Sequence, residues 1–374
     1  MERFEEGYCR SADGTAIYWS VRGPAGGTPE PDLVLCDGLG CDGFIWKYLI
    51  PAFSDRHRIV RFHYRAHGRS ETPTDLSRLS MAALVDDLFA AMDAARSERA
   101  VLAGHSMGVQ VILEAHRRHP NRVRALVPIC GSYGHPLDTF HGTDALRSAL
   151  PYIHRLVTAV PRAVLTVWST LLPSPVAYFV ALLAGEVNRS LIRIEDLQPY
   201  FDHLARMDPR VFVTLLEAVS KHSAEDHLPH VDVPTLVIGA EHDSFTPVWL
   251  SRRMAECIPG AELLIVPKGS HAAPLEQPEL VALRLEKFLR ERLGCYAPAL
   301  SSGSPSPSAS VGEASSPEAV PSDGSSGEGA SRNASSRDAS SAEADDASTT
   351  GTLSPAPSRR DAGASASSST GRAG

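Results

Sequence analysis

A serine lies between two glycines in the pentapeptide Gly-His-Ser-Met-Gly at 104–108. An apolar run, 100–103, precedes it and a helical pattern follows at once. This order predicts a sharp strand-to-helix turn that exposes the Ser106 hydroxyl at the end of a sheet, flanked by residues small enough for the turn. The Met107 amide would begin the helix and point at the group that Ser106 attacks. The pentapeptide alone also arises by chance, so its interpretation depends on its surroundings.

A serine hydroxyl is a weak nucleophile. It requires a general base, and the base requires a carboxylate that fixes its tautomer and stabilises its positive charge. We predict that His271, in a loop after the last expected strand, is the base, and that Asp243, in the loop after a strand at 235–238, is the acid. All three residues would follow the carboxyl ends of strands, where open α/β sheets build their sites. The order Ser, Asp, His is the one expected for a nucleophile elbow.

Other residues compete for these two roles. His67 and His105 are alternatives for the base, although the ring beside the serine would point away from it. Glu241 is the alternative for the acid, and Asp243 could instead cap the helix that begins near Pro247.

Attack of a serine on a carbonyl creates an oxyanion, which two aligned backbone amides would stabilise. We predict the amides of Met107 and Leu39, the latter in the glycine-rich loop 37–40 that follows an apolar strand. Such a loop can also cradle a phosphate. This one lacks both the Gly-Lys-Ser/Thr ending of a P-loop and a complete G-x-G-x-x-G, which disfavours a nucleotide site.

Strands and helices alternate around these residues. We predict strands in a hairpin at 7–22 and then at 33–36, 58–62, 100–103, 123–130, 233–239 and 261–266, and helices at 80–95, after 106, at 250–258 and at 280–293. The alternation predicts an α/β fold with a mostly parallel central sheet and helices on both faces. It stops between about 133 and 230, which predicts a helical cap inserted after the sixth strand.

The cap contains a long uncharged stretch, 163–185. Its length would suit a membrane-spanning helix, but Pro173 and Pro175 divide it into pieces too short to span. We predict two apolar helices over the site, with membrane-surface contact as an alternative. Two alternatives account for the apolar composition of the cap: an apolar acyl or aromatic substrate, or simple packing of the cap on the core. We expect Trp46, Trp168 and Phe179 to contact the substrate.

The last part of the chain, 297–374, is rich in Ser, Ala, Gly and Pro and has no aromatic residue. It cannot bury enough apolar surface to offset the entropy lost on ordering. We therefore predict a folded domain at 1–296 and a disordered tail at 297–374.

The net charge of −8 is mild and no basic stripe is present, which disfavours a nucleic-acid partner. The acidic start has no apolar signal segment, and the six cysteines show no C-x-x-C spacing. We therefore expect a cytoplasmic protein with reduced cysteines. We expect no cofactor and no metal, and a small-molecule substrate as the main partner; the pattern does not predict an oligomeric state.

The elbow pentapeptide, a His-x-Arg-x-His-Gly-x-Ser run at 63–70, Asp243 and Gly-Ser-His at 269–271 resemble the α/β-hydrolase superfamily with a helical cap. The resemblance covers about 7–293. It implies a serine hydrolase that forms an acyl-enzyme. Because position 106 is Ser and not Asp, it disfavours epoxide hydrolase and haloalkane dehalogenase chemistry.

The chain differs from that superfamily at three positions. Asp37 stands where the oxyanion loop usually begins with His, His63 where the later run usually has Asp, and Ala66 where it usually has Gly. Taken together, the residues predict hydrolysis of a carboxylic ester or related acyl compound, with an apolar small molecule as substrate. Cleavage of a carbon–carbon bond, lactone or amide, and acyl transfer, are alternatives within the fold. A non-catalytic protein that binds a ligand or partner is the alternative outside enzymes.

Overall fold

The structure is a computed structural model that describes residues 2–138, 143–177, 179, 187–188 and 190–296. Contacts divide the chain into two units, Met1–Ser302 and Gly303–Gly374, and all described residues belong to the first. The tail predicted at 297–374 lies outside the described residues, as does part of the apolar stretch of the cap.

One eight-stranded sheet forms the centre of the described part, in the order β1-β2-β4-β3-β5-β6-β7-β8. Its strands are β1 (Glu2–Arg10), β2 (Ala16–Pro24), β3 (Asp32–Cys36), β4 (Ile59–Phe62), β5 (Ala100–His105), β6 (Val123–Ile129), β7 (Leu236–Ala240) and β8 (Glu262–Val266). β1 and β2 form an antiparallel hairpin and β2 pairs antiparallel with β4, whereas the strands from β4 to β8 are parallel. The predicted fold class is confirmed.

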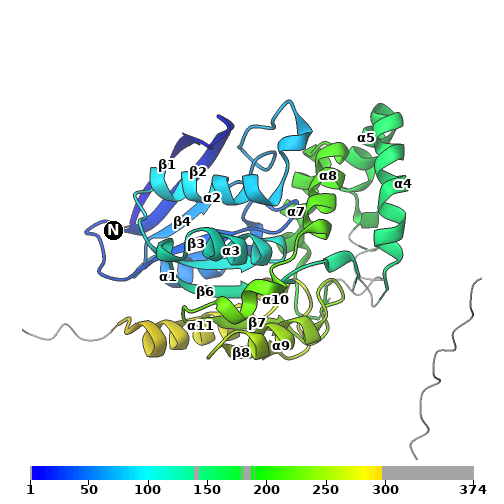
Figure 1. The fold of residues 1–374 in the computed structure, drawn as a ribbon. Helices are drawn as coiled ribbons and strands as arrows, with labels where there is room; N and C mark the ends of the chain where they lie inside the picture. Colours follow the sequence, from blue (N-terminus) through cyan, green and yellow to red (C-terminus); the bar gives the residue numbers. More distant parts are fainter. Residues whose placement is uncertain (1, 139–142, 178, 180–186, 189, 297–374) are drawn as a thin grey trace, which may run out of the picture. The chain divides into compact units, whose positions relative to one another are not determined.

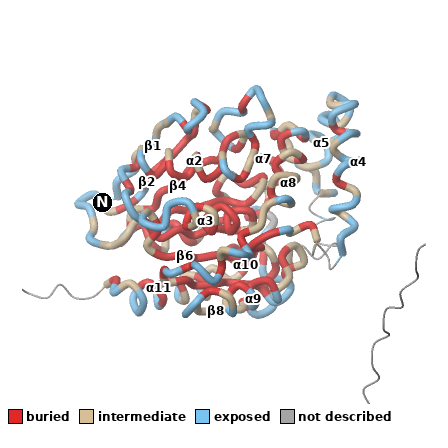
Figure 2. The backbone as a smooth tube through the Cα atoms, viewed as in Figure 1, coloured by how far each residue is buried: buried red, intermediate tan, exposed pale blue. Residues whose placement is uncertain are grey.

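Helices cover both faces of this sheet (Figure 1). They are α1 (Leu49–Phe53), α2 (Met81–Ala94), α3 (Met107–Arg118), α9 (Val248–Cys257), α10 (Ala273–Glu276) and α11 (Pro278–Leu293), with short 3₁₀ turns η1 (Phe44–Trp46), η2 (Leu76–Arg78), η3 (Pro120–Arg122), η4 (Pro136–Asp138) and η6 (Glu225–His230). Successive strand residues face opposite sides. Val34 and Leu102 accordingly pack in the core under α2, α3 and α9, and Leu33 and Val101 in the core under α1 and α11. Figure 2 shows this buried centre in red.

The cap lies between β6, the sixth strand, and β7, as predicted. Its described helices are α4 (Ala145–Ala159), α5 (Pro161–Leu171), α7 (Ile194–Arg206) and α8 (Pro209–Lys221). They gather at one end of the sheet, with α4 and α5 outermost (Figure 1). None of the described helices combines the length and the apolar character needed to cross a membrane; α5 ends two residues before Pro173.

The amino-terminal hairpin differs from its prediction. β1 begins at Glu2, five residues before the expected start. It is an edge strand with exposed or half-exposed side chains throughout, so it lacks the apolar pattern by which buried strands are detected.

Candidate active site

The turn between β5 and α3 holds Ser106 in a strained backbone conformation, with φ 54° and ψ −117°. Such values are rare for a residue with a side chain and are typical of functional turns. The chain can make this turn only with glycine on either side. A Cβ on Gly104 would lie 2.3 Å from the Gly108 carbonyl oxygen, and one on Gly108 would lie 2.3 Å from that of Cys36.

The structure brings together the three residues predicted for the chemistry. The Ser106 hydroxyl donates to His271 Nε2 over 2.9 Å, and His271 Nδ1 donates to Asp243 Oδ2 over 3.0 Å. The three follow β5, β8 and β7 at the carboxyl edge of the sheet. The base is thus within reach of the nucleophile, and the acid within reach of the base, as nucleophilic catalysis requires.

Asp243 is buried and fully hydrogen-bonded. Its carboxylate accepts the backbone amides of Phe245 and Thr246 and the Thr246 hydroxyl, besides His271. Burial alone would raise the pKa of Asp243, but the His271 charge and the hydrogen bonds from His271 and Thr246 outweigh it and hold this pKa below its usual value. The group is therefore ionised at neutral pH and orients the imidazole.

The structure supports neither Glu241 as the acid nor Asp243 as the cap of a helix. Glu241 accepts the Lys268 amide at an exposed position. Helix α9 begins after Pro247 without a side-chain cap, so Asp243 does not cap it.

The two alternative bases each hold a backbone group near the site. His105 Nε2 donates to the His271 carbonyl over 2.9 Å, and burial lowers the pKa of His105 to about 3, so its ring is neutral. His67 Nε2 accepts the Gly40 amide over 3.0 Å while Nδ1 donates to the Arg65 carbonyl. Burial lowers the pKa of His67 to about 4. The sequence gave no signal of the contacts to the His271 carbonyl and the Gly40 amide, because each of these joins segments far apart in the chain.

The glycine-rich loop after β3 lies directly against the nucleophile. A Cβ on Gly38 would be 3.1 Å from Ser106 Cβ. Leu39 and Met107 both line the cavity above Ser106, and neither amide donates to a backbone carbonyl elsewhere in the described part of the chain. Both amides are therefore available for an oxyanion.

Asp37, which stands in place of the usual histidine, has a partner of its own. It is buried and accepts the Trp46 indole N–H over 2.6 Å. Burial raises the pKa of Asp37 to about 7, against the attraction of Arg61 and the Trp46 hydrogen bond. Trp46 is fully buried in this contact and does not line the cavity. Its predicted contact with substrate is corrected: Trp46 supports the loop instead.

The run at 63–70 is structural. The Arg65 guanidinium is buried and pairs with Asp87 over 2.7 Å and with Asp13 over 2.8 Å, which joins α2 to the turn of the β1–β2 hairpin. His63 Nδ1 accepts the Arg69 amide. Ala66 adopts φ 61°, a conformation that glycine takes without strain, so the departure from Gly at this position has an energetic cost.

A cavity of about 770 Å³ lies above Ser106 between the core and the cap. Its lining is apolar except near the catalytic residues, at Gln110 and at Ser132. Trp168 lines it, so its contact with substrate stays a prediction, and its indole N–H donates to the Leu204 carbonyl. Phe179 does not line the cavity: its side chain is 62% exposed. That prediction is also corrected.

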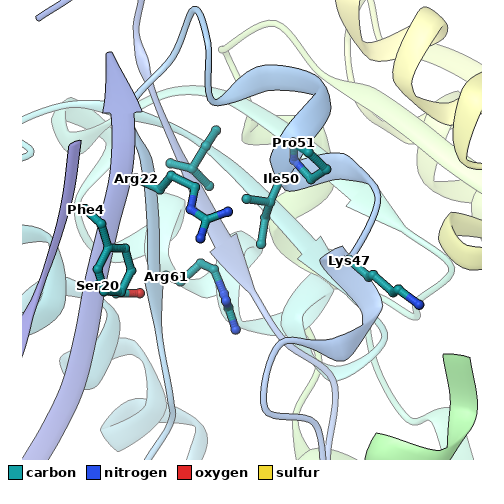
Figure 3. Close-up of a pocket in the computed structure, with 8 residues that line it drawn as sticks. Phe4, Ser20, Arg22, Lys47, Ile50, Pro51 and Arg61 are labelled. Carbon is teal, nitrogen blue, oxygen red and sulfur yellow. The ribbon is translucent and has the colours of Figure 1, made fainter. Parts of the chain in front are cut away.

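A second pocket, of about 190 Å³, shares no lining residue with the first. It lies beside β2 and β4 and is lined by three cations, Arg22, Lys47 and Arg61 (Figure 3). Lys47 points away from the other two and pairs with Asp196, while Arg61 donates to the Asp42 carbonyl. The pocket has no histidine or carboxylate in its lining, so the larger cavity is the candidate active site.

Comparison with known proteins identifies the family of this chain. The family described as alpha/beta hydrolase fold matches residues 31–278. The chain therefore belongs to this family and is a hydrolase of the alpha/beta fold.

Proteins named for several activities are similar to this chain. The "Putative carbamate hydrolase RutD" of Caulobacter sp. (strain K31) is 29% identical over 276 residues, which cover 73% of this chain and 95% of the relative. The solved enol-lactonase of Burkholderia xenovorans LB400 has a TM-score of 0.60 at 22% identity, over 76% of this chain and 100% of the other. The esterase RhEst1 of Rhodococcus sp. ECU1013 has a TM-score of 0.61 at 22% identity, over 77% and 99%. The structural likenesses bear on the fold alone.

Proposed function

We propose that this chain is a serine hydrolase that cleaves an apolar carboxylic ester, or a related acyl compound, through an acyl-enzyme. The observation that carries the proposal is the hydrogen-bonded series Ser106, His271, Asp243 at the floor of an apolar cavity. Acyl transfer to serine requires a base within hydrogen-bond reach of the serine and an acid that orients the base, and both contacts are present.

The reaction follows from these contacts. Ser106 Oγ attacks the carbonyl carbon while its proton passes to His271 Nε2. Asp243 stabilises the imidazolium that forms. His271 then gives the proton to the leaving oxygen, which departs and leaves the acyl group on Ser106. Water, deprotonated by the same imidazole, attacks the acyl-enzyme, and the proton returns to Ser106 as the acid is released.

The negative oxygen of each tetrahedral intermediate would lie between the amides of Leu39 and Met107. Losing one such donor typically costs on the order of 3 kcal/mol of transition-state stabilisation. Lactones, amides and carbamates present the same carbonyl to the same groups. The names of the relatives are consistent with any of these acyl classes, and the apolar lining favours an uncharged, lipophilic member of them.

Labelling with a fluorophosphonate probe tests the proposal. Wild type should be labelled and Ser106→Ala should not. Ser132→Ala is the matched control, because Ser132 lines the same cavity and its hydroxyl forms hydrogen bonds with the Gly134 backbone. We expect it to be labelled. Absence of labelling in wild type with a native circular dichroism spectrum would refute the catalytic proposal in favour of a non-catalytic binding protein.

A further inference from the structure

The outer pair of cap helices exposes an unusual concentration of large apolar side chains. Nine of the fourteen exposed large hydrophobic residues in the described part of the chain lie between 152 and 179. We name six of them the α4–α5 face: Tyr152, Leu156, Val160, Leu165, Val167 and Leu171. Figure 2 shows these helices largely exposed at the outer side of the cap. Monomeric soluble proteins rarely expose large apolar patches unless the patch binds something, and these side chains lie on two helices that contact each other.

The charges on the same helices have one sign. Residues 145–172 include no Asp or Glu, but three arginines and a histidine. Arg147 pairs with Asp138, and His154 with Glu217. Arg155 and Arg162 are exposed and form no ion pair with a described residue. The face is therefore apolar and basic, in a chain whose net charge is −8.

The apolar side chains and the positive charge together indicate which partner binds the α4–α5 face. A second copy docked through the same face would bring the unpaired arginines of both copies together, which is unfavourable. An acidic protein would complement the arginines, but it would also need an apolar surface to cover the aliphatic side chains. The surface of an anionic lipid bilayer satisfies both, since apolar side chains enter the acyl boundary while arginines meet the phosphates.

The face is continuous with the cavity. Leu156, and Ile153 beside it, are exposed and also line the cavity above Ser106. An apolar molecule leaving a bilayer at α4 would thus pass directly into an apolar chamber without crossing water. This part of the argument rests on the proposed function; the docking itself does not.

We propose that the α4–α5 face docks the protein on anionic lipid surfaces, so that a lipid-dissolved acyl substrate enters the cavity beside α4.

Flotation of the full chain with lipid vesicles tests the docking. We expect it to bind vesicles of phosphatidylcholine and phosphatidylglycerol in equal parts, to bind phosphatidylcholine alone at least about tenfold more weakly, and to dissociate from the mixed vesicles in about 0.5 M salt. Two double variants separate the contributions: Leu165→Glu with Val167→Glu, and Arg155→Glu with Arg162→Glu. None of these four residues lines the cavity. Each double variant should weaken binding by about tenfold or more.

The matched control is Leu283→Glu with Arg290→Glu, which alters one exposed apolar residue and one exposed arginine on α11. It should bind as wild type. Failure of wild type to bind either vesicle, or equal losses in control and face variants, would overturn docking. So would a wild-type dimer in sedimentation that Leu165→Glu with Val167→Glu abolishes, which would assign the face to a second copy.

The soluble fluorophosphonate probe keeps this proposal apart from the catalytic one. Both face variants should label at the wild-type rate in the absence of vesicles. If wild type is labelled but does not bind vesicles, the catalytic proposal stands and the docking proposal is refuted. If wild type binds vesicles but is not labelled, the docking proposal stands and the catalytic proposal is refuted.

Discussion

The residue whose replacement is most informative is Asp243, because its only predicted task is to hold and charge-balance His271. Asp243→Asn retains the shape but removes the charge, and its amide N–H₂ can face the ring as a donor, which favours the wrong imidazole tautomer. We expect kcat for a p-nitrophenyl ester to fall about 10³- to 10⁴-fold. The free energy of unfolding at neutral pH should also decrease, because the folded state stabilises the ionised carboxylate. Glu241→Gln, two residues earlier and exposed, should lower kcat less than about threefold. Similar losses in both variants would contradict the assignment of the acid.

A second residue-scale prediction concerns Asp37. Its pKa is about 7 in the folded protein against an ordinary value of 3.8, with burial as the main cause. Between these values the folded state binds more protons than the unfolded state, so the free energy of unfolding decreases as pH rises from about 4 to about 7. Asn at this position can still accept the Trp46 N–H but does not titrate.

We therefore expect the free energy of unfolding of wild type to fall by on the order of a few kcal/mol more than that of Asp37→Asn between pH 5 and pH 8. Urea denaturation at the two pH values measures the difference. Parallel pH dependence in the two proteins would show that Asp37 is ionised in the folded state without cost.

At the scale of elements, the sequence predicted the parts whose signal is local. The strand-turn-helix at Ser106, the apolar strand β3 and the helix predicted at 80–95 each follow from neighbouring residues. In the structure, Ser80 Oγ caps this helix, α2, by accepting the Ala83 amide. The start of β1 and the placement of Trp46 and Phe179 could not be predicted, because edge-strand pairing and burial by distant segments leave no periodic pattern. His271, the partner of His105, and Gly40, which donates to His67, lie 166 and 27 residues away, so these contacts could not be predicted for the same reason.

The elbow also makes a quantitative prediction about its glycines. An alanine Cβ at Gly108 would meet the Cys36 carbonyl oxygen at 2.3 Å, and rigid backbone surrounds it. Gly108→Ala should lower the free energy of unfolding by about 2 to 4 kcal/mol and abolish labelling of Ser106. At Gly26 a Cβ would meet nothing within 4 Å and φ is not positive, so Gly26→Ala should be neutral or stabilise by up to about 1 kcal/mol. Chemical denaturation of the two variants compares them, and equal stabilities would show that β3 can move away from α3.

At the scale of the whole molecule, substrate choice arises where the cap meets the core, since neither part encloses the cavity alone. The core supplies Ser106 and the oxyanion amides, while α4, α5, α7 and α8 supply most of the apolar lining. A cavity of about 770 Å³ is large enough for a medium or long acyl chain. Among p-nitrophenyl esters, we therefore expect kcat/KM to rise from acetate to octanoate.

Val164 on α5 lines this cavity, whereas Thr166 on the same helix is exposed and does not. Val164→Trp places an indole in the space expected for the acyl chain. It should lower kcat/KM for octanoate by about tenfold or more and leave kcat/KM for acetate within about threefold. The reason is that each lost methylene contact costs about 1 kcal/mol, and octanoate would lose several such contacts. Thr166→Trp adds the same ring outside the cavity and should leave the chain-length profile unchanged. If both variants, or neither, shifted the chain-length profile, the acyl chain would not occupy the space beneath α5. The cap would then control how substrate enters the cavity and not which acyl chain fits in it.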